Sequence, residues 1–407
     1  MKRRHFIQKG TLAAVALPVK SLTPLDFLYP KGFQSKIKIG LIGCGVRGTY
    51  LLKIVQEQIN NAEVVACCDI LESNLQRAMG LLSSEAEGHK DYKAILNSSE
   101  IEAVIIATPL HLHFAMAMEA IDAGKHIYCE KTMCYNIPQS LELYHKVKSS
   151  PNTFQVGYQQ RSNLLLHKIK DLIKNGWCGE ITHIDCAWNR NGDWRRRVKD
   201  PELDKLINWR MYKEFSGGLT TELCSHQIDM VNYLIEAHPE KVTGFGGIDY
   251  YKDGRETFDN VNIIFEYPKG LKAKFSALTT NSHEGFYVKL YGTKATIEVT
   301  RKNGQEAFIF PERPPDTSMN MHVDGVTGAT MEAWDRQEGI PIKTAGATDD
   351  ETATKMALEG FLNCVLKGNR PTADVLSGYL TSVSTHMANA AMSNERIEYW
   401  KEVYNVI

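Results

Sequence analysis

The chain has no excess of either charge and no long apolar run. Its 407 residues carry 47 Lys and Arg against 48 Asp and Glu, a formal net charge of -1, with no long basic tract. This balance excludes a global field that would draw the chain to nucleic acid or to an anionic membrane surface. No segment reaches the ~18 apolar residues of a membrane-spanning helix. We therefore expect a small-molecule ligand, no nucleic-acid partner and no membrane insertion.

Cysteine lacks the spacings that build a disulfide framework or a metal site. The nine cysteines are an odd number, and none form the paired C-x-x-C pattern of zinc or thioredoxin-like sites. Several lie in apolar stretches such as residues 63–69, so we expect buried free thiols. His111 and His113 would point away from each other on a strand and have no matching third ligand, so no metal site is predicted.

The N-terminus carries a different signal. Residues 1–24 hold paired arginines at positions 3 and 4, then Phe6 and a short stretch of small apolar residues. This order is typical of a twin-arginine export signal, which predicts a periplasmic protein. The alternative is a disordered basic tail on a cytoplasmic protein. We expect residues 1–34 to be signal and linker, outside the folded domains.

Strands and helices alternate over residues 35–158. Apolar strand patterns cover 36–42, 63–69, 103–107, 126–129 and 153–158, and helical spacing covers 49–58 and 138–148. This alternation predicts βαβ units with a parallel sheet, the arrangement of a Rossmann domain.

The pattern changes from about residue 162. A helix to 175, a strand at 181–189 and a helix to about 234 precede four strands in series, at 261–267, 271–278, 286–291 and 295–299. Short turns between adjacent strands predict an antiparallel sheet. Residues 302–347 are expected to be irregular, and two helices at 350–366 and 373–392 to pack back on the body. The predicted fold class is α/β: a Rossmann domain, then an α+β domain with an open, mostly antiparallel sheet over 159–375, and a helix and tail over 376–407.

A glycine motif with strong context marks the cofactor site. The segment 43–48 has the pattern G-x-G-x-x-G, follows a strand and opens a helix. The glycines allow a tight turn, close approach of a pyrophosphate and close helix packing. Asp69, 21 residues beyond Gly48, is placed to bind ribose hydroxyls and to repel a 2′-phosphate, which favours NAD over NADP. Arg47 could add a cation beside the phosphates. The alternative is a glycine turn without a nucleotide. The predicted cofactor contacts here are Gly43, Cys44, Gly45, Val46, Arg47, Gly48 and Asp69.

Five motifs in order carry a family resemblance. They are GCGVRG at 43–48, ATPLHLH at 107–113, GKHIYCEK at 124–131, GGLTTELCSHQIDM at 217–230 and YGTKATIEV at 291–299. With them the chain resembles the glucose-fructose oxidoreductase, inositol dehydrogenase and MocA family over nearly all of its mature length. The resemblance implies a Rossmann domain before a domain with an open sheet, and a homodimer or homotetramer formed through that sheet.

The resemblance also implies residue roles. Lys131 matches the family lysine beside the nicotinamide, and His226 and Glu222 match a proton-accepting histidine and its acidic neighbour. Thr108, Pro109, His113 and Glu130 would line the cofactor. One departure is Thr132, which stands where the family usually has proline after the lysine.

The chemistry of alcohol oxidation fits these residue types. Hydride transfer needs a base for the hydroxyl proton, and histidine has a suitable pKa. Glu222 and His226 are four apart, so on a helix the carboxylate could orient the imidazole, and Asp229 could do the same from the other side. Lys131 would supply positive charge where an alkoxide develops.

Two segments before Gly217 predict a sugar site. Residues 188–197 and 208–212 are rich in aromatic, Arg and Asn side chains, which stack on sugar rings and bind hydroxyls. The alternative is a surface or subunit-contact loop. The predicted substrate contacts are Arg161, Trp194, Trp209, Arg210, Tyr212 and Asp229.

The leading hypothesis is an NAD-dependent oxidoreductase acting on a ring hydroxyl of a sugar, glycoside or polyol. An exported enzyme meets no nicotinamide pool, so its NAD would be tightly bound and recycled. A second hypothesis is a glycosidase that oxidises the sugar transiently, eliminates the aglycone and reduces again. A third is a non-catalytic nucleotide-binding sensor.

Overall fold

The computed structural model describes residues 36–301, 305–312 and 338–406. The predicted export signal and linker at 1–34 lie outside these residues. From Ile37 onward the chain forms one compact unit, so the domain boundaries at 158 and 375 stay predictions.

The N-terminal half is built on a parallel sheet of six strands, in the order β3-β2-β1-β4-β5-β6. The strands are β1 (Ile37–Ile42), β2 (Ala62–Cys68), β3 (Glu87–His89), β4 (Ala103–Ile106), β5 (His126–Cys129) and β6 (Phe154–Val156). Their apolar runs are buried on both faces, as parallel strands between helices require. This half confirms the predicted Rossmann-type sheet.

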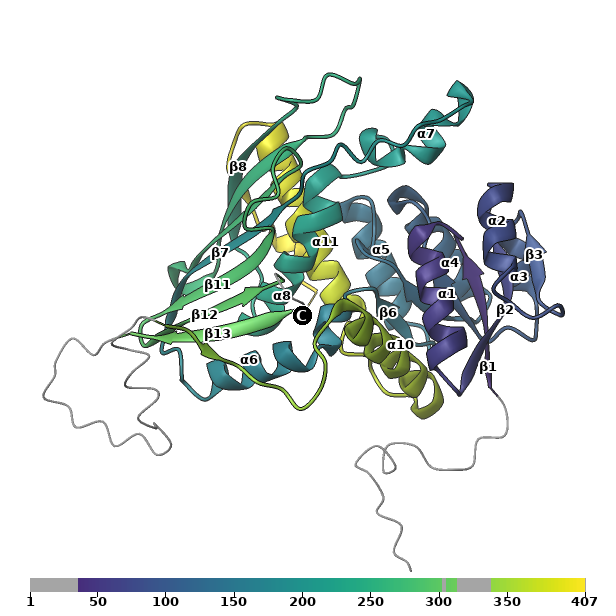
Figure 1. Cartoon of the computed structure of the whole chain (residues 1–407), viewed down its shortest axis with the longest axis horizontal. Helices are drawn as coiled ribbons and strands as arrows, with labels where there is room; N and C mark the ends of the chain where they lie inside the picture. The colour runs from purple at the N-terminus through teal and green to yellow at the C-terminus, as the bar shows by residue number, and fades with distance from the viewer. Residues whose placement is uncertain (1–35, 302–304, 313–337, 407) are drawn as a thin grey trace, which may run out of the picture. The chain divides into compact units, whose positions relative to one another are not determined.

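Five helices connect these strands (Figure 1). They are α1 (Val46–Gln58), α2 (Glu72–Met79), α3 (Lys93–Asn97), α4 (His113–Asp122) and α5 (Ile137–Lys148). Asn136 begins α5, because its side chain accepts a hydrogen bond from the Gln139 amide and Pro138 suits the first turn. The expectation of a strand for His111 and His113 was wrong: they lie in a short 3₁₀ turn and at the start of α4.

The second sheet has nine strands, in the order β14-β13-β12-β11-β7-β10-β9-β8-β15. They are β7 (Ile181–Asn189), β8 (Lys241–Gly247), β9 (Asn260–Glu266), β10 (Lys272–Leu278), β11 (Phe286–Gly292), β12 (Ala295–Thr300), β13 (Glu306–Pro311), β14 (Ile340–Pro341) and β15 (Glu398–Tyr399). All neighbours pair antiparallel except β7 and β10, which are parallel. The sheet is mixed and mostly antiparallel, as predicted. The irregular segment expected at 302–347 was wrong in part, because β13 and β14 lie in it.

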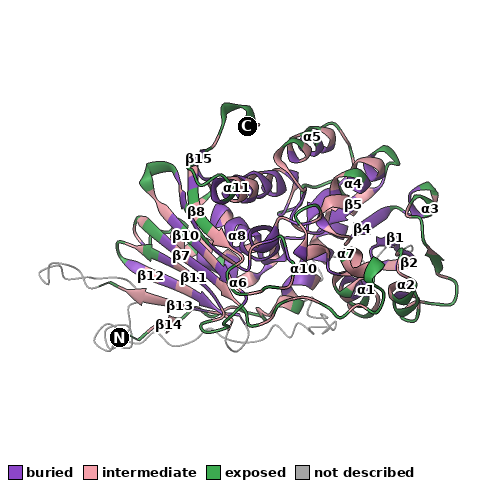
Figure 2. Cartoon of the chain, turned by 90° about the horizontal axis from the view of Figure 1, so that it is seen from above, coloured by how far each residue is buried: buried purple, intermediate pink, exposed green. Residues whose placement is uncertain are grey.

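One face of this sheet is covered by helices and the other is open (Figure 2). The covering helices are α6 (Leu164–Lys174), α8 (Ser225–Ile235) and α11 (Val375–Ser393). Along β9, Val261, Ile263 and Phe265 are buried while Asn262 and Ile264 between them are exposed. This alternation of period two is the signature of a sheet with one buried face.

Helix α10 (Asp350–Lys367) joins the C-terminal part of the chain to the Rossmann sheet. Its Leu358, Phe361 and Leu362 are buried in one apolar cluster with Leu51 and Tyr128 of the N-terminal half. The helix begins at Asp349, whose side chain accepts a hydrogen bond from the Thr352 amide. Asp350 Oδ1 in its first turn accepts hydrogen bonds from Gln159 and Gln160, which places the start of α10 beside the segment that follows β6.

Candidate functional site

The glycine turn after β1 leaves room where a ligand must approach. Gly43 has φ +96, and a Cβ there would lie 2.7 Å from the Ala107 backbone. A Cβ on Gly48 would lie 1.9 Å from the Gly43 carbonyl oxygen, whereas a Cβ on Gly45 would meet nothing within 4 Å. Helix α1 begins directly after Gly45, at the exposed Val46. The turn therefore presents open backbone at a helix N-terminus, which suits the phosphates of a dinucleotide.

Asp69 braces this turn from the end of β2. Its Oδ2 accepts a hydrogen bond from the Cys44 backbone amide at 2.8 Å, and its Oδ1 accepts one from the Leu71 amide at 2.8 Å. The carboxylate remains partly exposed, so it can also accept from ribose hydroxyls. The Cys44 thiol points into the core, which leaves only the backbone of Cys44 for a cofactor.

Arg47 is committed to a protein carboxylate. Its Nε donates to Glu130 Oε1 at 2.7 Å, and Glu130 in turn packs against Gly157, where a Cβ would lie 2.8 Å from Oε1. Burial disfavours the charge of Arg47, but Glu130 outweighs it and raises the pKa of the guanidinium. Arg47 Nη2 has no hydrogen-bond partner among the described residues, so a role for Arg47 beside the pyrophosphate stays a prediction.

His113 lies beneath the cofactor loops. Its Nδ1 is 2.9 Å from the Thr132 carbonyl oxygen and its Nε2 is 2.9 Å from the Thr108 carbonyl oxygen. Burial lowers the pKa of the imidazole. The expectation that His113 lines the cofactor is corrected: the side chain is 2% exposed and ties the 108–109 turn to the loop that carries Lys131. Thr108 and Pro109 are half-buried at the rim of that turn.

Lys131 joins the two halves of the site. The peptide between Lys131 and Thr132 is cis. Lys131 Nζ donates to the Glu222 backbone carbonyl at 2.9 Å and lies 3.9 Å from Glu222 Oε2. Arg210 Nε donates to the same Oε2 at 2.8 Å. Burial lowers the pKa of Lys131, and burial would raise that of Glu222, but Lys131 and Arg210 together hold the pKa of Glu222 below its ordinary value.

His226 faces the same space from the first turn of α8. Its ring contacts Tyr158 edge-on at a centroid distance of 6.1 Å and Trp188 at 5.5 Å. Burial first, and then the charges of Lys131, Arg301 and Arg47, lower the pKa of His226 well below 6.5. A neutral imidazole beside a lysine is a competent proton acceptor at neutral pH.

Neither expected carboxylate orients His226. The segment η5 (Thr220–Cys224) is a π-helical turn, so residues 222 and 226 do not stack as they would in an α-helix. The Glu222 carboxylate contacts Arg210 and Lys131 instead. Asp229 is buried, and both of its carboxylate oxygens accept a hydrogen bond from Arg161 Nε at 2.9 Å.

Arg161 and Asp229 are also not substrate contacts. Asp229 is 0% exposed and Arg161 is 9% exposed. Their ion pair, supported by Thr381 at 3.3 Å from Asp229 Oδ1, links the segment before α6 to α8 and α11. A buried charge of each sign requires such a partner. The sequence expectation for both residues is corrected accordingly.

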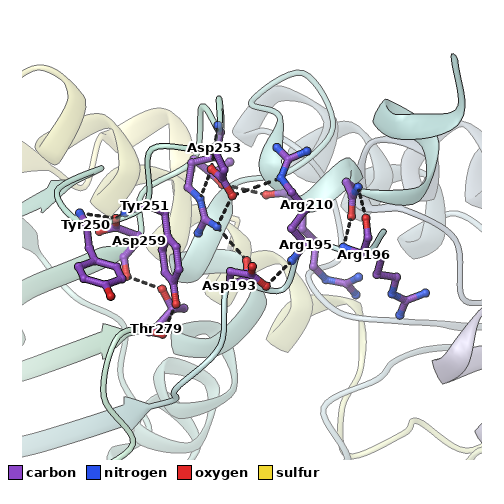
Figure 3. A network of polar contacts seen from close by, with 12 residues as sticks. Asp193, Arg195, Arg196, Arg210, Tyr250, Tyr251, Asp253, Asp259 and Thr279 are labelled. Carbon is purple, nitrogen blue, oxygen red and sulfur yellow. Dashed lines mark hydrogen bonds and ion pairs between the residues drawn. The ribbon is translucent and has the colours of Figure 1, made fainter. Parts of the chain in front are cut away.

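Polar contacts tie the arginine-rich segment 188–197 to neighbouring loops, as Figure 3 shows for Arg195 and Asp253. The Arg195 amide donates to Asp193 at 3.0 Å, and its Nε donates to Asp253 at 3.2 Å. Tyr212, expected to contact substrate, donates its hydroxyl hydrogen to Asp204. Trp209 stacks on Arg210, whose guanidinium carbon is 4.2 Å from the ring centroid, so Trp209 borders the site through Arg210.

A pocket of about 350 Å³ is lined by Trp188, whose ring packs on His226; His226 itself does not line it. It contains Trp194, expected as a substrate contact, and two residues outside the predicted set, Trp188 and Arg301. The Trp188 ring packs on His226, and the Arg301 guanidinium carbon lies 5.2 Å from the Trp188 ring centroid. Trp188 is signalled by its place at the end of β7. Nothing local signals Arg301, which follows β12 far along the chain.

Two further observations concern a metal site and a membrane span. Over the parts of the chain that the structure describes, no group of three His, Cys, Asp or Glu could hold a metal ion. None of the described helices is long and apolar enough to cross a membrane.

Comparison with known proteins gives two family matches. Residues 37–158 match the oxidoreductase family with an NAD-binding Rossmann fold, and residues 166–298 match the GFO/IDH/MocA C-terminal domain. The chain is 32% identical over 231 residues to the levoglucosan dehydrogenase of Pseudarthrobacter phenanthrenivorans, covering 51% of this chain and 57% of that protein. It is 27% identical over 267 residues to the 2,7-anhydro-N-acetylneuraminate hydratase of Escherichia coli, covering 65% of this chain and 67% of that protein.

A solved structure shares the whole fold. Levoglucosan dehydrogenase in complex with NADH and levoglucosan superposes with a TM-score of 0.72 at 19% identity, covering 90% of this chain and 99% of that chain.

Proposed function

Because the chain belongs to the GFO/IDH/MocA family of NAD-binding oxidoreductases, we propose that it oxidises a ring hydroxyl of a sugar, glycoside or polyol to a ketone. Relatives named levoglucosan dehydrogenase and inositol 2-dehydrogenase support a carbohydrate substrate. NAD bound at the glycine turn supplies the hydride acceptor.

One observation carries the proposal: Lys131 of the Rossmann half contacts Glu222, four residues before His226, and its charge acts on His226. Lys131 crosses between the halves, with Nζ 2.9 Å from the Glu222 carbonyl oxygen. The charges that lower the pKa of His226 include that of Lys131, so the two side chains are electrostatically coupled. A lysine coupled to a neutral histidine suits deprotonation of an alcohol.

The residues divide the work as follows. His226, neutral at physiological pH, accepts the hydroxyl proton. The Lys131 ammonium stabilises the alkoxide as the hydride leaves the same carbon. Glu222, held charged by Arg210, keeps Lys131 aimed into the cavity and balances its charge. Trp188, packed on His226, offers a flat face to a sugar ring.

His226→Gln tests the base. The variant keeps a polar side chain but has no basic nitrogen, so we expect NAD binding within about twofold of wild type and kcat lower by on the order of 100-fold to 10,000-fold. The assay follows NADH absorbance across a panel of sugars, polyols and glycosides, with NAD affinity from protein fluorescence. Unchanged turnover would remove His226 from the mechanism.

A transient oxidation with elimination is the second candidate. It uses the same residues, and the similarity to a protein named as a hydratase supports reactions without net oxidation at such a site. The known NAD-dependent glycosidases carry a different histidine motif in place of the segment 217–230, so we place this candidate second. Aglycone release without net NADH would favour it. A bound nucleotide with no reaction on any glycoside would favour a sensor.

We further propose export of the folded protein with its NAD retained, on the basis of the twin-arginine pattern at positions 3 and 4. We propose a homo-oligomer through the open face of the second sheet, where Ile264 is 46% exposed between Lys274 of β10 and Thr243 of β8. Nicotinamide absorbance and mass of the purified protein test both the bound cofactor and the assembly. A cofactor-free protein in its native compartment would contradict retention.

A further inference from the structure

The pocket beside His226 has an unusual charge. Its ten lining residues include two guanidinium groups and no acidic side chain: Trp188, Asn189, Arg190, Asn191, Gly192, Trp194, Ser282, Gly285, Phe286 and Arg301. The remaining polar groups are amides and one hydroxyl, which suit sugar hydroxyls. The walls are thus those of a carbohydrate site with an added positive field.

Arg301 is the half-buried cation of this pocket, with its side chain 22% exposed. Its guanidinium carbon lies 4.3 Å from the Phe286 ring centroid and 5.2 Å from that of Trp188. Nε donates to Gln305 Oε1 at 3.3 Å, the one hydrogen bond that the described residues accept from this side chain. A guanidinium has five N–H donors, and the described residues accept from only one of those of Arg301. Burial lowers the pKa of the guanidinium, which an anionic partner would offset.

Among the described residues, Asp350 is the carboxylate that pairs with Arg301, and it does so at long range. Asp350 Oδ1 lies 3.7 Å from Arg301 Nη2 and already accepts hydrogen bonds from the side chains of Gln159 and Gln160, each at 3.1 Å. Arg190 adds a second, exposed guanidinium, 5.8 Å from the Trp194 ring centroid. Two guanidinium groups thus line the pocket, and none of its lining residues is acidic, which suits an anionic ligand.

We propose that this pocket binds the carboxylate of an acidic sugar, a hexuronic acid or a glycoside of one, with the sugar ring against Trp188 and a ring hydroxyl at His226. Arg301 receives the carboxylate in the fork geometry that guanidinium groups favour, and Arg190 closes over it from the exposed side. This inference rests on the proposed function, because it names the substrate class of the same site. A phosphorylated sugar is the competing anion, and it forms one arm of the test.

Binding is tested on the full-length protein loaded with NAD. Isothermal titration compares D-glucuronate and D-galacturonate with their methyl esters, with glucose and galactose, and with glucose 6-phosphate. The ester keeps the ring and removes the charge, so it is the matched ligand control. We expect each acid that binds to bind on the order of tenfold or more tightly than its ester, from charge-assisted hydrogen bonds.

Two variants assign the effect to the pocket. Arg301→Gln is expected to abolish the preference of acid over ester, and Arg190→Gln to reduce it several-fold. Lys174→Gln is the control, since Lys174 lies on the far end of α6 and pairs with Glu236 at 2.9 Å. If Arg301→Gln does not fold, the exposed Arg190 decides the question. Equal binding of acid and ester, tighter binding of glucose 6-phosphate, or a preference that survives in both variants would overturn the inference.

Turnover separates this inference from the proposed function. Ketone formation from neutral sugars with no preference for acids leaves the function standing and overturns the acidic substrate. Selective binding of an acid with no oxidation, elimination or NADH formation leaves the pocket assignment standing and overturns the function.

Discussion

The cofactor turn at 43–48 is made by six neighbouring residues, whereas the pocket beside His226 is lined by residues between positions 188 and 301. In the turn, function depends on missing side chains, because open backbone at Gly45 admits a ligand. In the pocket, function depends on charges that must be partnered or left free. Two arginines show these alternatives. Arg161, outside the pocket, is paired with Asp229, whereas Arg301, in the pocket, keeps donors for a ligand.

The largest effect on stability is expected from removing Asp229 from its buried ion pair with Arg161. Asp229→Ala leaves Arg161 buried without a countercharge, which should lower the free energy of unfolding by about 3–5 kcal/mol. Chemical denaturation measures this. Glu236→Gln is the control, because Glu236 is 55% exposed and its pairs with Lys170 and Lys174 should contribute about 0–1 kcal/mol. Equal losses for the two variants would mean that Asp229 does not neutralise a buried charge.

Sequence patterns predicted what local chemistry controls. The strands at 126–129 and 181–189 lie at the predicted positions, because short runs of β-forming residues of that length are typical of strands. Strand β8 (Lys241–Gly247) was missed because three of its seven residues are glycine, which weakens the strand signal. The glycine turn and Asp69 also followed from spacing alone.

Long-range contacts account for what the sequence did not indicate. Whether Asp229 meets His226 or Arg161 depends on how α8 packs on the segment before α6, and no spacing encodes that choice. The π-helical turn at 220–224 redirects Glu222 toward Lys131 and Arg210. Arg301 joins the pocket only because β12 lies beside β11, whose Phe286 it covers.

Two glycines of the turn should respond differently to the same added methyl group. Gly48→Ala places Cβ 1.9 Å from the Gly43 carbonyl oxygen, so it should cost about 1–3 kcal/mol of stability and abolish NAD binding. Gly45→Ala meets no protein atom within 4 Å, so the protein without cofactor should keep its stability while NAD binding weakens. Thermal unfolding with and without NAD measures both. Tight NAD binding by Gly45→Ala would place the phosphates away from this turn.

The smallest change is expected when pH is varied near neutrality. Burial and the charges of Lys131, Arg301 and Arg47 lower the pKa of His226 well below 6.5, so the base is neutral from about pH 8 down through 6.5. The acid limb of kcat/KM should therefore be flat over this range and fall only at lower pH. An acid limb with its midpoint at 6.5 or above would mean that His226 is not the titrating base.

The same lowered pKa predicts a small dependence of stability on pH. The unfolded chain binds a proton at His226 near pH 6.5 and the folded chain does not, so this contribution is fully present above 6.5 and is lost as pH falls toward the folded value. Replacing the imidazole removes it: the free energy of unfolding of His226→Gln should fall less than that of wild type between about pH 7.5 and about pH 5.5. Parallel losses in both proteins would place the acid sensitivity at other groups, such as buried His386, whose pKa burial lowers to about 4.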